Sequence, residues 1–125
     1  MNARTETDLC VIGGGSAGLS VASGAVQMGA RVVLIEGHRM GGDCLNYGCV
    51  PSKALLAAAK HAHAMTTGGP FGIAPAVPEV DFGAVKDHVE AVIAGIAPHD
   101  SVERFTGLGV DVIEARARFI SSTEV

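Results

Sequence analysis

The chain has 125 residues, of which 48% are hydrophobic and 18% charged, and its formal net charge at pH 7 is −4. This length suits one modest domain or part of one, and the composition is that of a globular protein. The nine lysines and arginines are scattered, so no basic patch indicates nucleic-acid binding. No apolar stretch reaches the roughly 18 residues of a membrane span. We therefore expect a cytoplasmic globular protein without a nucleic-acid or membrane partner.

The first part of the chain predicts a strand, a turn, a helix and a second strand. Residues 9–12 are a short apolar run that leads into three glycines, as in a buried parallel strand that ends in a tight turn. The alanine-rich segment 16–28 predicts a helix, and residues 31–35 form a second β-branched run. This order is a βαβ unit, which places the chain in the α/β class.

After this unit, the sequence predicts a long loop, several inserted helices and a last strand. Residues 37–48 have no hydrophobic period and contain four glycines, which predicts a long loop. A helix is expected over residues 51–66, because proline suits a first helical turn. Asp81 can cap another helix, and a short helical piece is expected around residues 101–105. Residues 113–119 alternate apolar and polar side chains, which predicts a strand.

The glycine turn after the first strand fits the pattern G-x-G-x-x-G through Gly13, Gly15 and Gly18. Such glycines allow a tight turn, let the backbone approach a pyrophosphate and let the helix pack closely on the strand. Glu36 ends the second strand, where a carboxylate accepts hydrogen bonds from an adenosine ribose and disfavours a 2′-phosphate. The alternative is a plain turn followed by a solvated strand end. The pattern predicts dinucleotide binding but does not separate FAD from NAD.

Cys44 and Cys49 lie five positions apart, about 7.5 Å along a regular helix at ~1.5 Å per residue. A disulfide therefore needs a bend in the chain, and Gly48 gives the backbone that freedom. Cys49 lies just ahead of the expected helix start at Pro51, where free N–H groups favour a thiolate. The spacing thus indicates a redox-active pair, with Cys49 as the thiol more readily ionised.

Two other interpretations of the cysteines stay open from the residues alone. The pair can be unconnected thiols, or it can bind zinc together with His61 and His63. The two histidines are two apart on one expected helix and so point in different directions, which disfavours zinc. The third cysteine, Cys10, is expected to pack in the core of the first strand.

Residues 41–53, Gly-Gly-Asp-Cys-Leu-Asn-Tyr-Gly-Cys-Val-Pro-Ser-Lys, resemble the active-site signature of the class I pyridine nucleotide-disulfide oxidoreductases. This family includes dihydrolipoamide dehydrogenase, glutathione reductase and mercuric reductase. The resemblance implies that the dinucleotide is FAD. It also implies that Cys44 is the interchange thiol that meets the substrate, that Cys49 faces the flavin and forms the charge-transfer complex, and that Lys53 is a cation near the isoalloxazine.

Other positions carry expectations from the same resemblance. Ala17 and Gly37 match positions whose backbone lies against the diphosphate and adenosine ends of the cofactor, and Ala117 matches the strand position that contacts adenine. Asp43 departs from the family, which commonly has threonine there. A carboxylate beside the FAD phosphates is repulsive unless it turns away, binds a cation or caps the following turn.

The resemblance implies electron transfer between NAD(P)H, FAD and the Cys44–Cys49 disulfide, and on to a thiol, disulfide or Hg(II) substrate, as in cell redox homeostasis. We expect the chain to be the N-terminal, incomplete part of a Rossmann-like FAD-binding domain, with the NAD(P) and interface domains of a homodimer outside it. The chain alone is then expected to be inactive and to bind FAD poorly. The alternatives are a flavin-binding or electron-carrying module without dithiol catalysis, and a non-enzymatic thiol or metal module.

Overall fold

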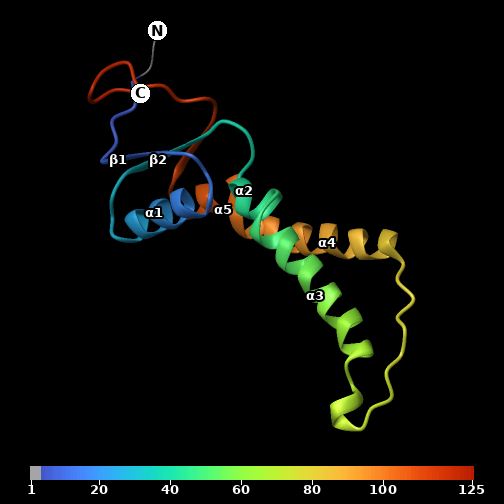
Figure 1. The fold of residues 1–125 in the computed structure, drawn as a ribbon. Helices are drawn as coiled ribbons and strands as arrows, with labels where there is room; N and C mark the ends of the chain where they lie inside the picture. Colours follow the sequence, from blue (N-terminus) through green and yellow to red (C-terminus); the bar gives the residue numbers. More distant parts are fainter. Residues whose placement is uncertain (1–3) are drawn as a thin grey trace.

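The structure is a computed structural model, and it describes residues 4–125. Three parallel strands form a small sheet in the order β1 (Leu9–Ile12), β2 (Val32–Glu36) and β3 (Asp111–Glu114). Helix α1 (Ser16–Gln27) connects β1 to β2, so the predicted βαβ unit is confirmed. Figure 1 shows this unit at one end of the molecule.

The core lies between one face of the sheet and the helices α1 and α5 (Val102–Gly107). Parallel register places Val11 beside Leu34 and Leu34 beside Val112, which makes a continuous apolar row on that face. The other members of the buried cluster are Val32 of β2, Leu19 and Ala22 of α1, Phe105 of α5, and Val110. Hydrophobic burial of this single face holds the sheet and the two helices together.

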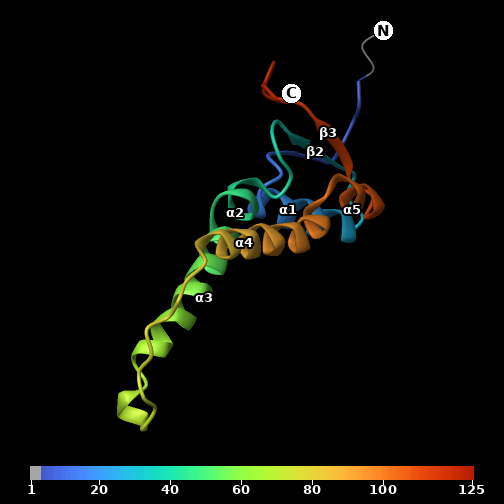
Figure 2. The same cartoon turned by 90° about the vertical axis from the view of Figure 1, so that its right-hand side faces the viewer.

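Two long helices extend away from the sheet. Helix α3 (Cys49–Thr66) projects from the α/β unit, and an irregular connection with the 3₁₀ turn η1 (Gly69–Phe71) leads back to α4 (Phe82–Ile96) (Figures 1 and 2). The short turn η2 (Ala97–Asp100) joins α4 to α5. The side chain of Asp81 accepts a hydrogen bond from the N–H of Ala84, which confirms the predicted N-cap of α4.

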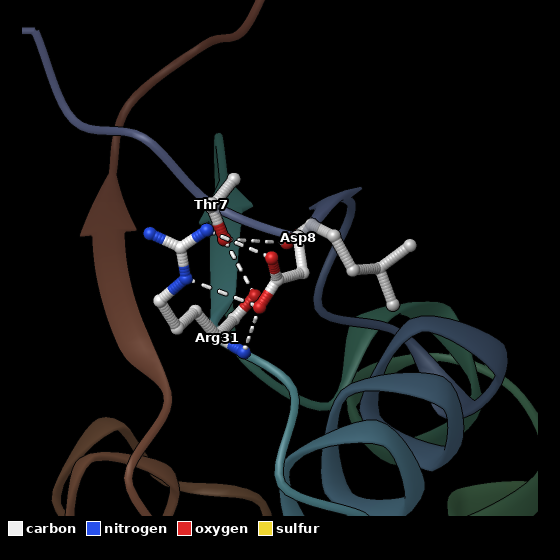
Figure 3. Close-up of polar contacts among 4 residues, drawn as sticks. Thr7, Asp8 and Arg31 are labelled. Atoms are coloured by element: carbon white, nitrogen blue, oxygen red, sulfur yellow. Dashed lines mark hydrogen bonds and ion pairs between the residues drawn. The ribbon is translucent and has the colours of Figure 1, made fainter.

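At the edge of the sheet where the strands begin, charged and polar groups connect the residues before β1 to Arg31, which precedes β2 (Figure 3). Asp8 accepts from the backbone N–H of Arg31 at 2.8 Å and from the Arg31 guanidinium at 2.8 and 3.1 Å. The hydroxyl of Thr7 donates to the carbonyl oxygen of Arg31 at 2.6 Å. The Arg31 side chain, through its hydrogen bonds, lowers the pKa of Asp8 from its ordinary value of 3.8 to about 2.

Three predicted boundaries are wrong. The expected loop over residues 37–48 contains a helix, α2 (Gly42–Asn46), because Leu45 is buried and anchors a short helical turn there. The expected strand over residues 113–119 ends at Glu114, because Glu114 lies opposite the last residue of β2 and has no strand to pair with beyond it. The predicted helix at residue 51 begins two residues earlier, at Cys49.

The prediction that Cys10 packs in the core is also wrong. Side chains alternate along β1, so Val11 faces the core, while Cys10 and Ile12 face the other side of the sheet. The buried cluster that includes residues of α1 and α5 lies on the Val11 face, and Cys10 is exposed. Among residues 4–125, no helix is both long enough and apolar enough to cross a membrane.

Candidate functional site

The glycine turn between β1 and α1 adopts the geometry that its sequence pattern predicts. Gly13 has φ +104°, a backbone conformation that favours glycine. A β-carbon on Gly18 would overlap the carbonyl oxygen of Gly13 and lie 3.2 Å from Cγ1 of Val11. Glycine at this position therefore lets α1 approach the end of β1. Gly15 is the N-cap of α1, and no side chain caps the helix there.

Glu36 binds the backbone of its own chain through both carboxylate oxygens. Oε2 accepts from the N–H of Gly14 at 2.6 Å, and Oε1 accepts from the N–H of His38 at 2.6 Å. These are short, charge-assisted hydrogen bonds. The sequence indicated a ribose acceptor at Glu36, and the structure adds that the carboxylate connects the end of β2 to the glycine turn. Each oxygen keeps a second lone pair for a ligand hydroxyl.

The segment before α2 docks directly against this turn. The N–H of Gly41 donates to the carbonyl oxygen of Gly14 at 2.8 Å. Gly41 and Gly42 have φ of +86° and +58°, and a β-carbon on Gly42 would lie 2.7 Å from Cα of Gly15. Only glycine allows such an approach of two backbones. The two sequence motifs, which are far apart in the chain, therefore form one site.

Cys44 and Cys49 form a disulfide with a Cα–Cα distance of 4.7 Å. Cys44 lies on α2 and Cys49 is the first residue of α3, so the helix is broken between them. The break occurs at Tyr47 and Gly48, where a β-carbon on Gly48 would lie 2.9 Å from the carbonyl oxygen of Asp43. The bend that the spacing required is thus made by a glycine packed against the preceding helix.

The start of α3 provides an electrostatic environment that differs for the two sulfurs. Cys49 is exposed at the first position of α3, and Cys44 is half-buried on α2. Within the described part of the chain, no side chain caps α3 and no acidic residue lies in its first turn. The partial positive charge of the helix N-terminus therefore favours an anion at Cys49.

Two residues that sequence reasoning missed hold α2 in place. The side-chain amide of Asn46 donates to the carbonyl oxygens of Met40 at 3.1 Å and Gly42 at 2.8 Å. Leu45 is 3% exposed and packs against Gly41, where a β-carbon would collide with its side chain. The signal was present in the sequence, because an apolar residue and an amide stand inside the cysteine motif. Their function became evident only from the contacts.

The remaining predicted residues lie around this centre. Ala17 is exposed in the first turn of α1, and Lys53 is exposed in the second turn of α3. Asp43 is exposed in the first turn of α2, and its backbone carbonyl accepts from the N–H of Tyr47 at 2.9 Å.

At the ends of β2 and β3, Gly37 lies against the segment that follows β3. A β-carbon on Gly37 would lie 2.9 Å from Cγ of Arg116 and 3.5 Å from the carbonyl oxygen of Ala115. Ala117 is half-buried in an irregular segment rather than in a strand, because β3 ends at Glu114. The structure therefore brings Gly37 close to the residues before Ala117, at the end of the sheet nearest Glu36.

An open groove of about 260 Å³ lies beside the start of α3. Tyr47 forms one part of its wall, and the rest comes from residues of the first two turns of α3 and from four residues of α4. Among the described residues, no group of three or more His, Cys, Asp and Glu side chains could hold a metal ion. His61 and His63, the zinc ligands of the alternative interpretation, are exposed on α3.

Comparisons with known proteins agree with this arrangement. The sequence profile of the family described as pyridine nucleotide-disulphide oxidoreductase matches residues 7–125. A dihydrolipoyl dehydrogenase of Halobacterium salinarum is 38% identical over 97% of this chain and 25% of its own length. A mercuric reductase of Lysinibacillus sphaericus is 33% identical over 94% of this chain and 22% of its own length.

A solved structure is also similar to the chain. It is the Cu(II) complex of the HOCl-induced flavoprotein disulfide reductase RclA from Escherichia coli, with a TM-score of 0.71 and 26% identity over 91% of this chain and 23% of that one. The chain belongs to the pyridine nucleotide-disulphide oxidoreductase family. Its α/β fold is the Rossmann-like fold of a flavoprotein disulfide reductase fragment, as predicted. The chain spans about a quarter of the length of the relatives it matches.

Proposed function

We propose that this chain carries the FAD-binding turn and the redox-active disulfide of an NAD(P)H-dependent flavoprotein disulfide oxidoreductase. One observation carries the proposal: the helix with Cys44 docks on the dinucleotide-type glycine turn through the Gly41 to Gly14 hydrogen bond of 2.8 Å. A dinucleotide bound at this turn would lie next to the disulfide. The family of the chain supports the same function.

The residues at the turn fit the diphosphate of FAD. Among residues 4–125, no heavy atom lies within 4 Å of a β-carbon built on Gly13, and the nearest to one on Gly15 is Cα of Gly42 at 3.9 Å. In the described part of the chain, no side chain caps the start of α1 and no acidic residue lies in its first turn, so its N–H groups can bind an anion. FAD, when bound, supplies the two-electron chemistry that links NAD(P)H to the disulfide. The residues proposed to hold it are Gly13, Gly15, Ala17, Gly18, Glu36, Gly37, Asp43, Lys53 and Ala117.

The chemistry proposed for the two cysteines is thiol–disulfide exchange. Two electrons and two protons convert the Cys44–Cys49 bond to two thiols. The thiolate of Cys44 attacks a substrate disulfide, which forms a mixed disulfide and releases one substrate thiol. Cys49, ionised at the start of α3, then attacks the sulfur of Cys44, restores the intramolecular bond and releases the second substrate thiol. The groove beside Tyr47 is lined also by Pro51 and Ser52 of α3, the helix that Cys49 begins, and it offers space for a substrate.

The finer parts of the proposal concern substrate and assembly. One relative is named for lipoyl chemistry and another for mercury, so we propose a small-molecule or protein-bound disulfide, or Hg(II), as substrate. We further propose that the NAD(P) and interface domains complete the enzyme as a cytoplasmic homodimer that serves cell redox homeostasis. The chain alone is expected to be inactive and to lose FAD on gel filtration; a chain that stays yellow contradicts this.

A chimaera tests the proposal. Residues 7–125 replace the matching segment of the Halobacterium salinarum dihydrolipoyl dehydrogenase, and NAD(P)H-dependent disulfide reduction is measured together with bound flavin. Cys44→Ser and Cys49→Ser are each expected to abolish reduction while flavin remains bound, and Cys10→Ser serves as the matched control with full activity. A flavin-loaded Cys44→Ser chimaera that still reduces disulfides would indicate an electron-carrying module without dithiol catalysis.

A further inference from the structure

Gly14 is buried at the centre of the site, and other segments bind both of its backbone polar groups. Its N–H donates to the carboxylate of Glu36 at 2.6 Å, and its carbonyl oxygen accepts from the N–H of Gly41 at 2.8 Å. Through these two hydrogen bonds, Gly14 connects the end of β2 to the segment that begins α2.

The packing around Gly14 leaves little room for independent movement. A β-carbon on Gly14 would lie 2.9 Å from Sδ of Met40 and 3.2 Å from Oε2 of Glu36. On the neighbouring side, the backbones of Gly15 and Gly42 are in direct contact. Because the Glu36 carboxylate is bonded to Gly14, and Gly14 to Gly41, loss of the carboxylate removes one of the contacts that hold the start of α2 in place.

Helix α2 has only five residues, and it carries Cys44. Its position relative to α3 decides whether Cys44 lies within disulfide distance of Cys49, which the structure shows as a Cα–Cα distance of 4.7 Å. We propose that Glu36 is a positioning residue for the redox centre, which holds α2 in this place through Gly14 and Gly41. This inference rests on the proposed redox function of the two cysteines and goes beyond it, because Glu36 touches neither sulfur.

The first experiment measures the equilibrium between the Cys44–Cys49 disulfide and glutathione in the 125-residue chain, by acid quenching, alkylation and mass spectrometry. Glutamine at this position keeps one acceptor oxygen, but its amide NH₂ group cannot accept a hydrogen bond from a backbone N–H. Glu36→Gln therefore loses one of the two hydrogen bonds that the carboxylate accepts. We expect the equilibrium constant for disulfide formation to fall about tenfold, which corresponds to roughly 30 mV.

Glu114→Gln is the matched control. Glu114 lies beside Glu36 in the register of β2 and β3 and is exposed, so the substitution removes the same charge at nearly the same place. We expect its equilibrium constant to stay within about twofold of the wild-type value, since an exposed charge is screened. An unchanged Glu36→Gln chain, or equal shifts in both variants, would overturn the inference. A wild-type chain that never forms the disulfide in oxidised glutathione would instead refute the proposed function.

A second experiment needs no substitution and decides the question if Glu36→Gln does not fold. Coupling is reciprocal, so reduction of the disulfide must loosen the hydrogen bonds to Glu36. Amide hydrogen exchange in the wild-type chain should become faster at Gly14 and His38 after reduction. The N–H of Arg31, bound to Asp8 at the opposite edge of the sheet, should keep its rate. Equal protection of Gly14 in both redox forms would overturn the inference.

Discussion

Glycine-to-alanine substitutions at two positions of α1 give opposite predictions. At Gly18 the added β-carbon overlaps the carbonyl oxygen of Gly13 and lies 3.2 Å from Cγ1 of Val11. Since the obstacle is backbone, α1 must shift away from β1, and overpacking of this kind costs about 1–3 kcal/mol. At Gly24, in the same helix, no heavy atom of the residues that the structure describes lies within 4 Å of the added β-carbon. There alanine should stabilise the helix by about 0.5–1 kcal/mol.

The two variants should therefore differ by about 2–4 kcal/mol in the free energy of unfolding, with Gly18→Ala less stable than the wild type and Gly24→Ala more stable. At roughly 4 °C per kcal/mol for a chain of this size, their Tm values should differ by about 8–16 °C. Thermal unfolding followed by far-UV circular dichroism measures this difference. Equal stability of the two variants would refute the assignment of Gly18 to a close helix–strand contact.

Three further predictions concern stability and the thiols. The Asp8–Arg31 pair lowers the pKa of Asp8 from 3.8 to about 2, so its stabilising effect is complete above pH 4 and is lost as the pH falls toward 2. The stability difference between wild type and Asp8→Asn should shrink over that range in urea titrations, and a constant difference would contradict the pKa. Iodoacetamide should modify one cysteine per oxidised chain, the exposed Cys10, and all three cysteines after reduction. Three adducts in the absence of a reductant would show that the disulfide is absent. Leu45→Ala, at a position 3% exposed, should cost about 2–4 kcal/mol, whereas Leu56→Ala, at one 67% exposed, should change stability by less than about 0.5 kcal/mol.

Local patterns in the sequence were sufficient for most elements. The apolar run of β1, the glycine turn and the alanine-rich α1 lie next to each other in the chain, and short-range periodicity and turn chemistry determine them. The Asp81 cap of α4 is local in the same way. The end of β3 was not predictable, because it depends on where its partner β2 stops. The exposure of Cys10 was not predictable either, since it depends on which face of the sheet is covered.

Both motifs of the candidate site, the G-x-G-x-x-G turn and the cysteine pair in a family signature, are evident in the sequence because each is contiguous. The way in which the two motifs join depends on tertiary contacts. Two hydrogen bonds to the peptide of Gly14 and the close approach of Gly42 to Gly15 bring the motifs into one site. Such contacts arise between backbone groups far apart in the chain, and a backbone N–H or carbonyl carries no sequence signal of the partner it will bind.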